Sequence, residues 1–357
     1  MRPGEVETAW TCPAPTGARP AVVVPRRGGT AWRSVRALGY AVAALALLRL
    51  VQSIDLSGVG HLVTAAGPVL PLVLVPFIIQ LALEAGAWHM FLGRLRYAVP
   101  WRAALRATLG AEGVRLAFPG GAAAGDALRP ALFRRLAGVP LGDGAAVLAV
   151  RKLCHLFTQG VFLAIGAALG ARAFASGAPP AAARGLEGLA WIAAVALALA
   201  AILLGLALFH GSLAARTERL LTRLTGGRLS RLLESRRITF AAVDARLRAL
   251  LGGHVGAVAW SVSSALAGWL LDAGETFLLL RVLGAPVTAG EAVAIESAVS
   301  LVRAAAFAVP GGVGVQDLGY HELLRGMTGE PIATAFVLLK RARDVFWIAA
   351  GFLTRPL

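Results

Sequence analysis

Several apolar stretches of the chain are long enough to cross the hydrocarbon core of a bilayer, and they constrain the fold more than any other feature. Examples are residues 62–83, 144–170, 186–209 and 331–353. A transmembrane helix needs about 20 predominantly apolar residues. Only 15% of the residues are charged, against roughly 25% in a soluble domain. We therefore predict an all-α polytopic membrane protein.

The arginines predict which helix ends face the cytoplasm, because short loops rich in Lys and Arg stay on that side. They place a disordered tail, residues 1–36, inside, followed by a transmembrane domain over residues 37–357 that also ends inside. The arginine-rich stretch 210–250 is expected to be a cytoplasmic loop. The basic cytoplasmic loops then account for the net charge of +16, so no nucleic-acid partner is expected. We predict about six full transmembrane helices in a bacterial cytoplasmic (inner) membrane.

Two Pro-Gly-Gly sequences interrupt segments that are too short to span. They comprise Pro119, Gly120 and Gly121, and Pro310, Gly311 and Gly312. Each is predicted to form the tip of a re-entrant hairpin, which is tolerated at membrane depth only where protein or water covers it. The sequences after the two tips match without a gap at an offset of 191 residues (310 − 119), which pairs Asp126 with Asp317.

The charge rule gives this internal repeat an inverted topology. Repeat one, about residues 67–170, begins with a helix that runs inward, and repeat two, about residues 255–353, begins with one that runs outward. In transporters, inverted repeats place the substrate site near the midplane, at the interface between the repeats. We expect the same location for a site in this chain.

Ionisable side chains within the apolar segments are the candidate functional residues, because a charge at that depth is costly. Arginine offers a phosphate a planar fork and lysine a point charge. The predicted ligands of a lipid phosphate are Arg151, Lys152, Lys340, Arg341 and Arg343. The predicted gating residues at the hairpin tips are Pro119, Gly120, Gly121, Asp126, Arg129, Pro310, Gly311, Gly312 and Asp317. The predicted supporting carboxylates are Glu84, Glu112, Asp272 and Glu296.

A structural interpretation of the same residues stays open. The cations can serve only in ion pairs, and Asp126 and Asp317 can serve only as helix caps. The sequence contains no HExxH, GxSxG or paired-cysteine motif, and its two cysteines are Cys12 and Cys154. We therefore predict no catalytic residue, no metal and no cofactor.

The segment PGGVGVQD from Pro310, followed by Gly329 and a Lys-Arg pair, resembles the end of a known membrane domain. This is the flippase-like domain of the lysylphosphatidylglycerol synthases, also called multiple peptide resistance factors. Gly125, Asp126 and Arg129 are similar to a Gly-Glu-x-x-Arg motif of that family, although Asp126 and Asp317 stand where the family usually has glutamate. The resemblance extends from about residue 62 to the C-terminus.

This resemblance implies a lipid flippase fold with two re-entrant hairpins. Bifunctional members carry a separate aminoacyl-transfer domain, and we expect this chain to be a stand-alone member without it. The expected function is translocation of a phosphate-bearing anionic lipid, either an anionic phospholipid or a polyprenyl phosphate, without enzymatic activity. Two alternatives are a membrane-embedded lipid-modifying transferase and a non-catalytic partner of lipid-synthesis enzymes. A homo-oligomer is compatible with each of these functions.

Overall fold

The computed structural model describes residues 67, 70–118, 121–174, 188, 191–199, 250, 255–305 and 314–354. All regular structure in these residues is helical, which confirms the all-α prediction. The predicted tail 1–36, residues 210–249 of the predicted loop, and the tip residues Pro119, Gly120, Pro310, Gly311 and Gly312 lie outside them.

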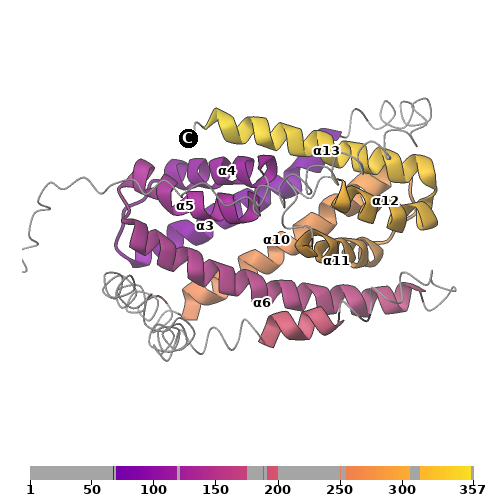
Figure 1. Cartoon of the computed structure of the whole chain (residues 1–357), viewed down its shortest axis with the longest axis horizontal. Helices are drawn as coiled ribbons and strands as arrows, with labels where there is room; N and C mark the ends of the chain where they lie inside the picture. The colour runs from indigo at the N-terminus through magenta and orange to yellow at the C-terminus, as the bar shows by residue number, and fades with distance from the viewer. Residues whose placement is uncertain are drawn as a thin grey trace, which may run out of the picture.

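The described helices follow the same order twice along the chain. A short 3₁₀ turn, η1 (Leu70–Val73), precedes the first set. That set comprises α3 (Leu74–Arg94), α4 (Trp101–Ala117), α5 (Gly121–Ala137) and α6 (Leu141–Phe174). The second comprises α10 (Val255–Val282), α11 (Ala289–Ala305), α12 (Val315–Thr328) and α13 (Glu330–Leu353). In each set a long helix is followed by two short ones and a second long one, and the two short pairs occupy opposite halves of the molecule (Figure 1).

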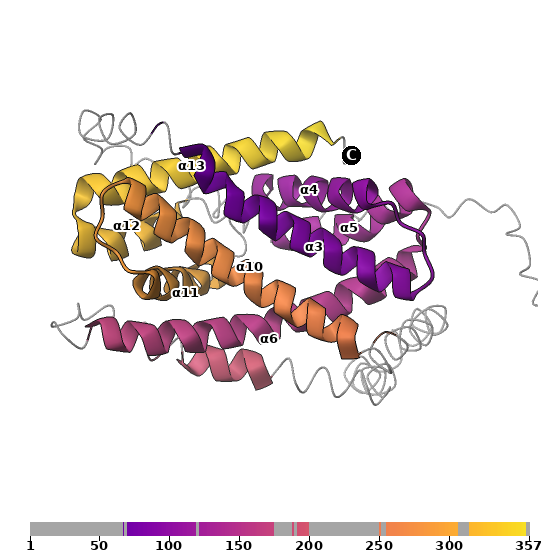
Figure 2. The same ribbon diagram turned by 180° about the vertical axis from the view of Figure 1, so that it is seen from behind.

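Equivalent long helices of the two sets run in opposite directions. Figure 2 shows α3 and α10 side by side and antiparallel, and α6 and α13 also run against each other. The short helices pack reciprocally, since α4 of the first set lies on α13 of the second and α11 lies on α6. The two sets therefore form one interlocked bundle.

Small residues allow the closest of these helix contacts. A Cβ atom built on Gly113 of α4 would lie 2.9 Å from the Cα atom of Gly351 in α13. A Cβ atom on Gly166 of α6 would likewise overlap Ser297 of α11. Within the first short pair, a Cβ atom on Gly125 would lie 2.6 Å from the carbonyl oxygen of Ala111. Small residues serve this purpose in membrane bundles because they let two helix backbones approach closely.

Two described segments are long and apolar enough to cross a membrane, Pro71–Arg94 and Leu141–Gly170. The outward face of the first keeps Leu72, Ile78 and Ile79 exposed. On α13, Val345 and Phe346 are also exposed. Large apolar side chains on an outer surface are costly in water and favourable in lipid.

Candidate functional site

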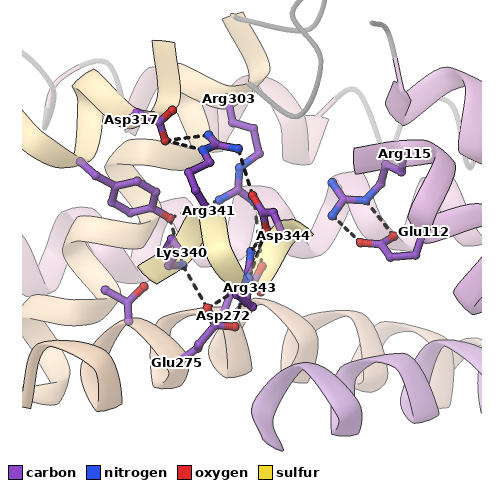
Figure 3. Close-up of polar contacts among 12 residues, drawn as sticks. Glu112, Arg115, Asp272, Glu275, Arg303, Asp317, Lys340, Arg341, Arg343 and Asp344 are labelled. Carbon is purple, nitrogen blue, oxygen red and sulfur yellow. Dashed lines mark hydrogen bonds and ion pairs between the residues drawn. The ribbon is translucent and has the colours of Figure 1, made fainter. Parts of the chain in front are cut away.

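The ionisable side chains of the bundle interior form two clusters, one in each repeat. Cluster one consists of Glu84, Asp126, Arg129, Arg151 and Lys152. Cluster two consists of Asp272, Glu275, Glu296, Arg303, Asp317, Lys340, Arg341, Arg343 and Asp344. An ion pair between Glu112 and Arg115, both on α4, interacts electrostatically with residues of both clusters. Figure 3 shows this pair beside cluster two.

Glu84 on α3 is the centre of cluster one. It accepts hydrogen bonds from the Nη1 atom of Arg129 at 2.7 Å, from the indole Nε1 atom of Trp88 at 3.0 Å, and from Arg151. Beside this group, Lys152 Nζ lies 2.5 Å from an oxygen of Asp126. Helices α3, α5 and α6 are therefore tied together through side chains that are all candidates from the sequence.

The second repeat also contributes to cluster one. The Nη1 atom of Arg151 donates to the Oγ atom of Ser261 at 2.7 Å and to its carbonyl oxygen at 3.0 Å. It also lies 3.3 Å from the Oγ atom of Ser264. Both serines belong to α10, so cluster one lies at the interface between the repeats.

Cluster one holds more positive than negative charge. Among the described residues it has three cations, Arg129, Arg151 and Lys152, against two carboxylates, Glu84 and Asp126. The Nε atoms of Arg129 and Arg151 are buried and have no hydrogen-bond acceptor in the described part of the chain. The side chain of Lys152 is 45% exposed. This arrangement leaves positive charge and N–H donors for an additional acceptor.

In cluster two the cations are outnumbered by carboxylates, although the Nε atom of Arg303 is buried there without a hydrogen-bond acceptor among the described residues. The Nζ atom of Lys340 lies 3.4 Å from Glu296 and 3.7 Å from Glu275, and it donates to the hydroxyl of Tyr320 at 3.2 Å. Arg343 donates to Glu275 at 2.6 Å and to Asp344 at 2.6 Å. These contacts bind α13 to α10, α11 and α12.

The remaining pairs of cluster two reach the two short helices. Arg341 lies 2.7 Å from Asp317 of α12 and 2.9 Å from Asp344. Asp317 also accepts a hydrogen bond from the backbone N–H of Gly314 at 2.8 Å and so caps the start of α12. Arg303 of α11 donates to Glu296 at 2.8 Å. The capping and ion-pair roles that the sequence left open for Asp317 therefore occur together.

Cluster two holds more negative than positive charge. Its four cations are Arg303, Lys340, Arg341 and Arg343, and its five carboxylates are Asp272, Glu275, Glu296, Asp317 and Asp344. Asp272 has the fewest hydrogen bonds and close ion pairs of these five carboxylates in the described part of the chain. Within the described residues it makes no hydrogen bond, and its ionic contact is Arg303 Nη1 at 4.0 Å.

The Glu112–Arg115 pair connects the clusters electrostatically. The Nε atom of Arg115 donates to Glu112 at 2.8 Å. Glu112 also interacts electrostatically with Arg129 and Glu84 of cluster one. The guanidinium of Arg115 is turned toward cluster two in Figure 3 and interacts electrostatically with Arg303 and Asp272. Its side chain is 34% exposed.

Sequence reasoning did not single out four of these residues: Arg115, Glu275, Arg303 and Tyr320. A signal for the two arginines exists, because each occupies the last turn of the helix before a Pro-Gly-Gly tip. Glu275 lies 191 residues after Glu84 (275 − 84), which is the offset of the repeat. A gapped match of the segments LALEAGAW and WLLDAGET instead pairs Glu84 with Asp272, yet in the structure it is Glu275 that binds the guanidinium of Arg343 in the last described helix.

Comparison with known proteins identifies the family of the chain. The family model of the lysylphosphatidylglycerol synthase transmembrane region matches residues 36–351. The chain belongs to this family. Neither the curated proteins nor the solved structures compared with it gave a match.

Membership of the lysylphosphatidylglycerol synthase transmembrane family makes the chain a membrane protein with a lipid-related function. The clusters are then surrounded by helices that face hydrocarbon. Electrostatic interactions are stronger in such low-dielectric surroundings than in water, and an unbalanced charge there is correspondingly costly. The opposite charge imbalances of the two clusters are therefore relevant to function.

Proposed function

We propose that the chain binds the phosphate of an anionic lipid at cluster one and moves the lipid across the membrane. The observation that carries this proposal is the excess positive charge of cluster one, with two buried guanidinium N–H groups that have no acceptor in the described part of the chain. A phosphate supplies both the negative charge and the acceptor oxygens that these groups need.

Three cations act electrostatically on one position near cluster one. His155 of α6 interacts in this way with Lys152, Arg151 and Arg115, and its ring stacks on Trp269 of α10 with 4.8 Å between ring centroids. A phosphate beside His155 would therefore experience the positive charges of two cations from repeat one and of Arg115. The two acyl chains would extend toward the lipid between helices.

Cluster two is less suited to hold the phosphate. The cations Lys340, Arg341 and Arg343 were candidate ligands from the sequence, but each is bound to carboxylates. Removing one partner of a buried ion pair costs about 3–5 kcal/mol. A phosphate would have to displace such partners, so we propose that these three residues form a supporting frame instead.

The opposite directions of equivalent helices support a transport function. Antiparallel α3 and α10, and short helix pairs in opposite halves, are the arrangement that inverted repeats produce (Figures 1 and 2). The proposed topology has about six spanning helices, two re-entrant hairpins and both termini in the cytoplasm. Rocking of one repeat against the other would expose cluster one to either side in turn.

The test is native mass spectrometry of lipids that remain bound to the purified protein. We expect an anionic phospholipid or polyprenyl phosphate on the wild type, and its loss from Lys152→Gln and Arg115→Gln. The matched control is Arg325→Gln, since Arg325 is exposed and lies outside both clusters. Retention of the lipid by both Lys152→Gln and Arg115→Gln would refute the assignment of the phosphate site to cluster one.

The proposal includes no covalent change to the lipid, and this distinguishes it from the transferase alternative. Membranes with and without the protein should contain the same lipid species, differing only in their distribution between the leaflets. A new lipid species that depends on the protein would instead support the transferase.

A further inference from the structure

The charges of the two clusters and the bridging pair sum to zero. Cluster one has one excess cation (3 − 2), cluster two has one excess carboxylate (5 − 4), and Glu112–Arg115 is neutral. A lipid phosphodiester bound at cluster one adds one negative charge to this network. A net charge in low dielectric is costly, and an ionisable group in such a site commonly changes its protonation state instead.

We infer that Asp272 takes up a proton when the lipid phosphate binds, so that the lipid crosses the membrane together with H⁺. This inference rests on the proposed function and adds the driving ion to it. The proton comes from water and adds to the carboxylate of Asp272, which becomes a neutral carboxylic acid. The loaded network is then neutral again, and the proton leaves when the lipid leaves.

Asp272 is the carboxylate of cluster two that can be protonated with the least loss of bonding. Glu275 accepts from Arg343, and Glu296 accepts from Thr276, Tyr320 and Arg303. Asp317 and Asp344 each bind Arg341 at short distance. Protonating any of these four would weaken at least one hydrogen bond or ion pair of 2.9 Å or less, whereas among the described residues Asp272 has only the 4.0 Å contact with Arg303.

The charged groups that face Asp272 come from four helices. They are Glu275 on α10, Glu296 and Arg303 on α11, Lys340 and Arg343 on α13, and Arg115 on α4. The side chain of Asp272 is 15% exposed, while those of Glu275 and Glu296 are 1% exposed. Water therefore reaches Asp272 more readily than its acidic neighbours.

Arg115 supplies a physical link between the two events. It interacts with Asp272 on one side and with His155, beside the proposed phosphate position, on the other. A phosphate at cluster one attracts the Arg115 guanidinium and so weakens its stabilisation of ionised Asp272. Lipid binding therefore favours protonation of Asp272, which is the direction needed for the lipid and the proton to bind together.

A proton fits this position better than a metal cation. The described residues contain no group of three or more His, Cys, Asp or Glu side chains arranged to hold a metal ion.

The test measures proton uptake by the full-length protein in detergent, in weakly buffered solution with a pH indicator. Short-chain phosphatidylglycerol is the probe, and short-chain phosphatidylcholine, which has no net charge, is the control lipid. We expect the wild type to take up about one proton per bound phosphatidylglycerol and none with phosphatidylcholine. Asp272→Asn should bind phosphatidylglycerol without proton uptake, and Glu322→Gln, on an exposed carboxylate, should behave as wild type.

Infrared difference spectra of the wild type provide a second measurement that needs no variant. Addition of phosphatidylglycerol should produce the carbonyl band of a protonated carboxyl group, shifted in D₂O. Binding without uptake and without this band would overturn the inference and leave the proposed function intact. Uptake that persists in a folded Asp272→Asn protein, or binding that requires sodium, would also overturn it. Absence of phosphatidylglycerol binding at any pH would instead count against the proposed function.

Discussion

Lys152 and Lys340, the only lysines in the chain, follow the two hairpins but lie in opposite surroundings. The side chain of Lys152 is 45% exposed and contacts one carboxylate, Asp126. The side chain of Lys340 is 6% exposed and lies against two carboxylates and a tyrosine hydroxyl. Two similar repeats thus provide one cation that can meet a ligand and one that is already neutralised.

This difference fits different roles for the two clusters, with cluster one binding the ligand and cluster two supporting the structure. Cluster one has few internal acceptors and borrows Ser261 and Ser264 from the other repeat. Cluster two pairs its cations with carboxylates of its own repeat and joins four helices. A symmetric phosphate site built equally from both repeats, as the sequence repeat implied, is therefore not the arrangement that we propose.

The largest effect should follow removal of a carboxylate from cluster two. Glu275→Gln leaves Arg343 and Lys340 short of a buried partner, and we expect a loss of about 3–5 kcal/mol in the free energy of unfolding. Thermal unfolding in detergent measures this loss. Glu322→Gln, at an exposed site, is the matched control and should change stability little. Equal stability of the two variants would remove the distinction between supporting and binding clusters.

The two lysines should separate stability from lipid binding. Lys340→Gln removes the buried cation that Glu296 and Glu275 share, although each keeps an arginine, and should lower the free energy of unfolding by about 3 kcal/mol. Lys152→Gln removes a half-exposed ion pair and should cost less than about 1 kcal/mol while abolishing lipid retention. Both properties are measured on the same purified samples. The reverse ranking would exchange the roles of the clusters.

The interlocked packing of the repeats can be tested at Gly351. A methyl group there would lie 2.6 Å from the Cα atom of Gly113, so Gly351→Ala should destabilise the protein by about 1–3 kcal/mol. Gly274→Ala is the matched control because no heavy atom lies within 4 Å of its added Cβ atom. A neutral Gly351→Ala variant would show that α4 and α13 separate easily.

The smallest effect should come from the serines that bind Arg151. Ser261→Ala removes a 2.7 Å hydrogen bond to a buried guanidinium, but the Nη1 atom of Arg151 keeps the carbonyl oxygen of residue 261 at 3.0 Å, so the cost should be about 0.5–1.5 kcal/mol. Ser264→Ala removes a 3.3 Å contact and should cost less. Unfolding curves of both variants, with lipid retention as a second readout, test whether α10 positions Arg151.

The sequence identified the ionisable residues well where a charged side chain interrupts an apolar helix, because a charge at that position is energetically costly. Arg151, Lys152 and Lys340 interrupt apolar helices, so their charge alone marked them as candidates. Arg115 and Arg303 were not singled out because they lie in the last turns of the short helices α4 and α11. A basic residue near the end of a short helix is common. Only the fold brings these two arginines toward the other charges.

Sequence could not determine which carboxylate binds which cation. Asp272 and Glu275 are three residues apart on α10 and therefore share a helix face. The alignment with Glu84 favours Asp272, but the distance to Arg343 selects Glu275. Charge balance depends on such pairings, so the opposite imbalances of the two clusters emerge only from the three-dimensional structure.

The reciprocal packing of α4 on α13 also has a consequence for biosynthesis. Gly113 is translated 238 residues (351 − 113) before Gly351, the residue of α13 that packs against it. Helix α4 must therefore be shielded by lipid or by the insertion machinery until α13 has been synthesised. We accordingly expect that ribosome-bound intermediates lacking α13 are protease-sensitive at the first hairpin, and that neither half of the chain matures when it is synthesised alone.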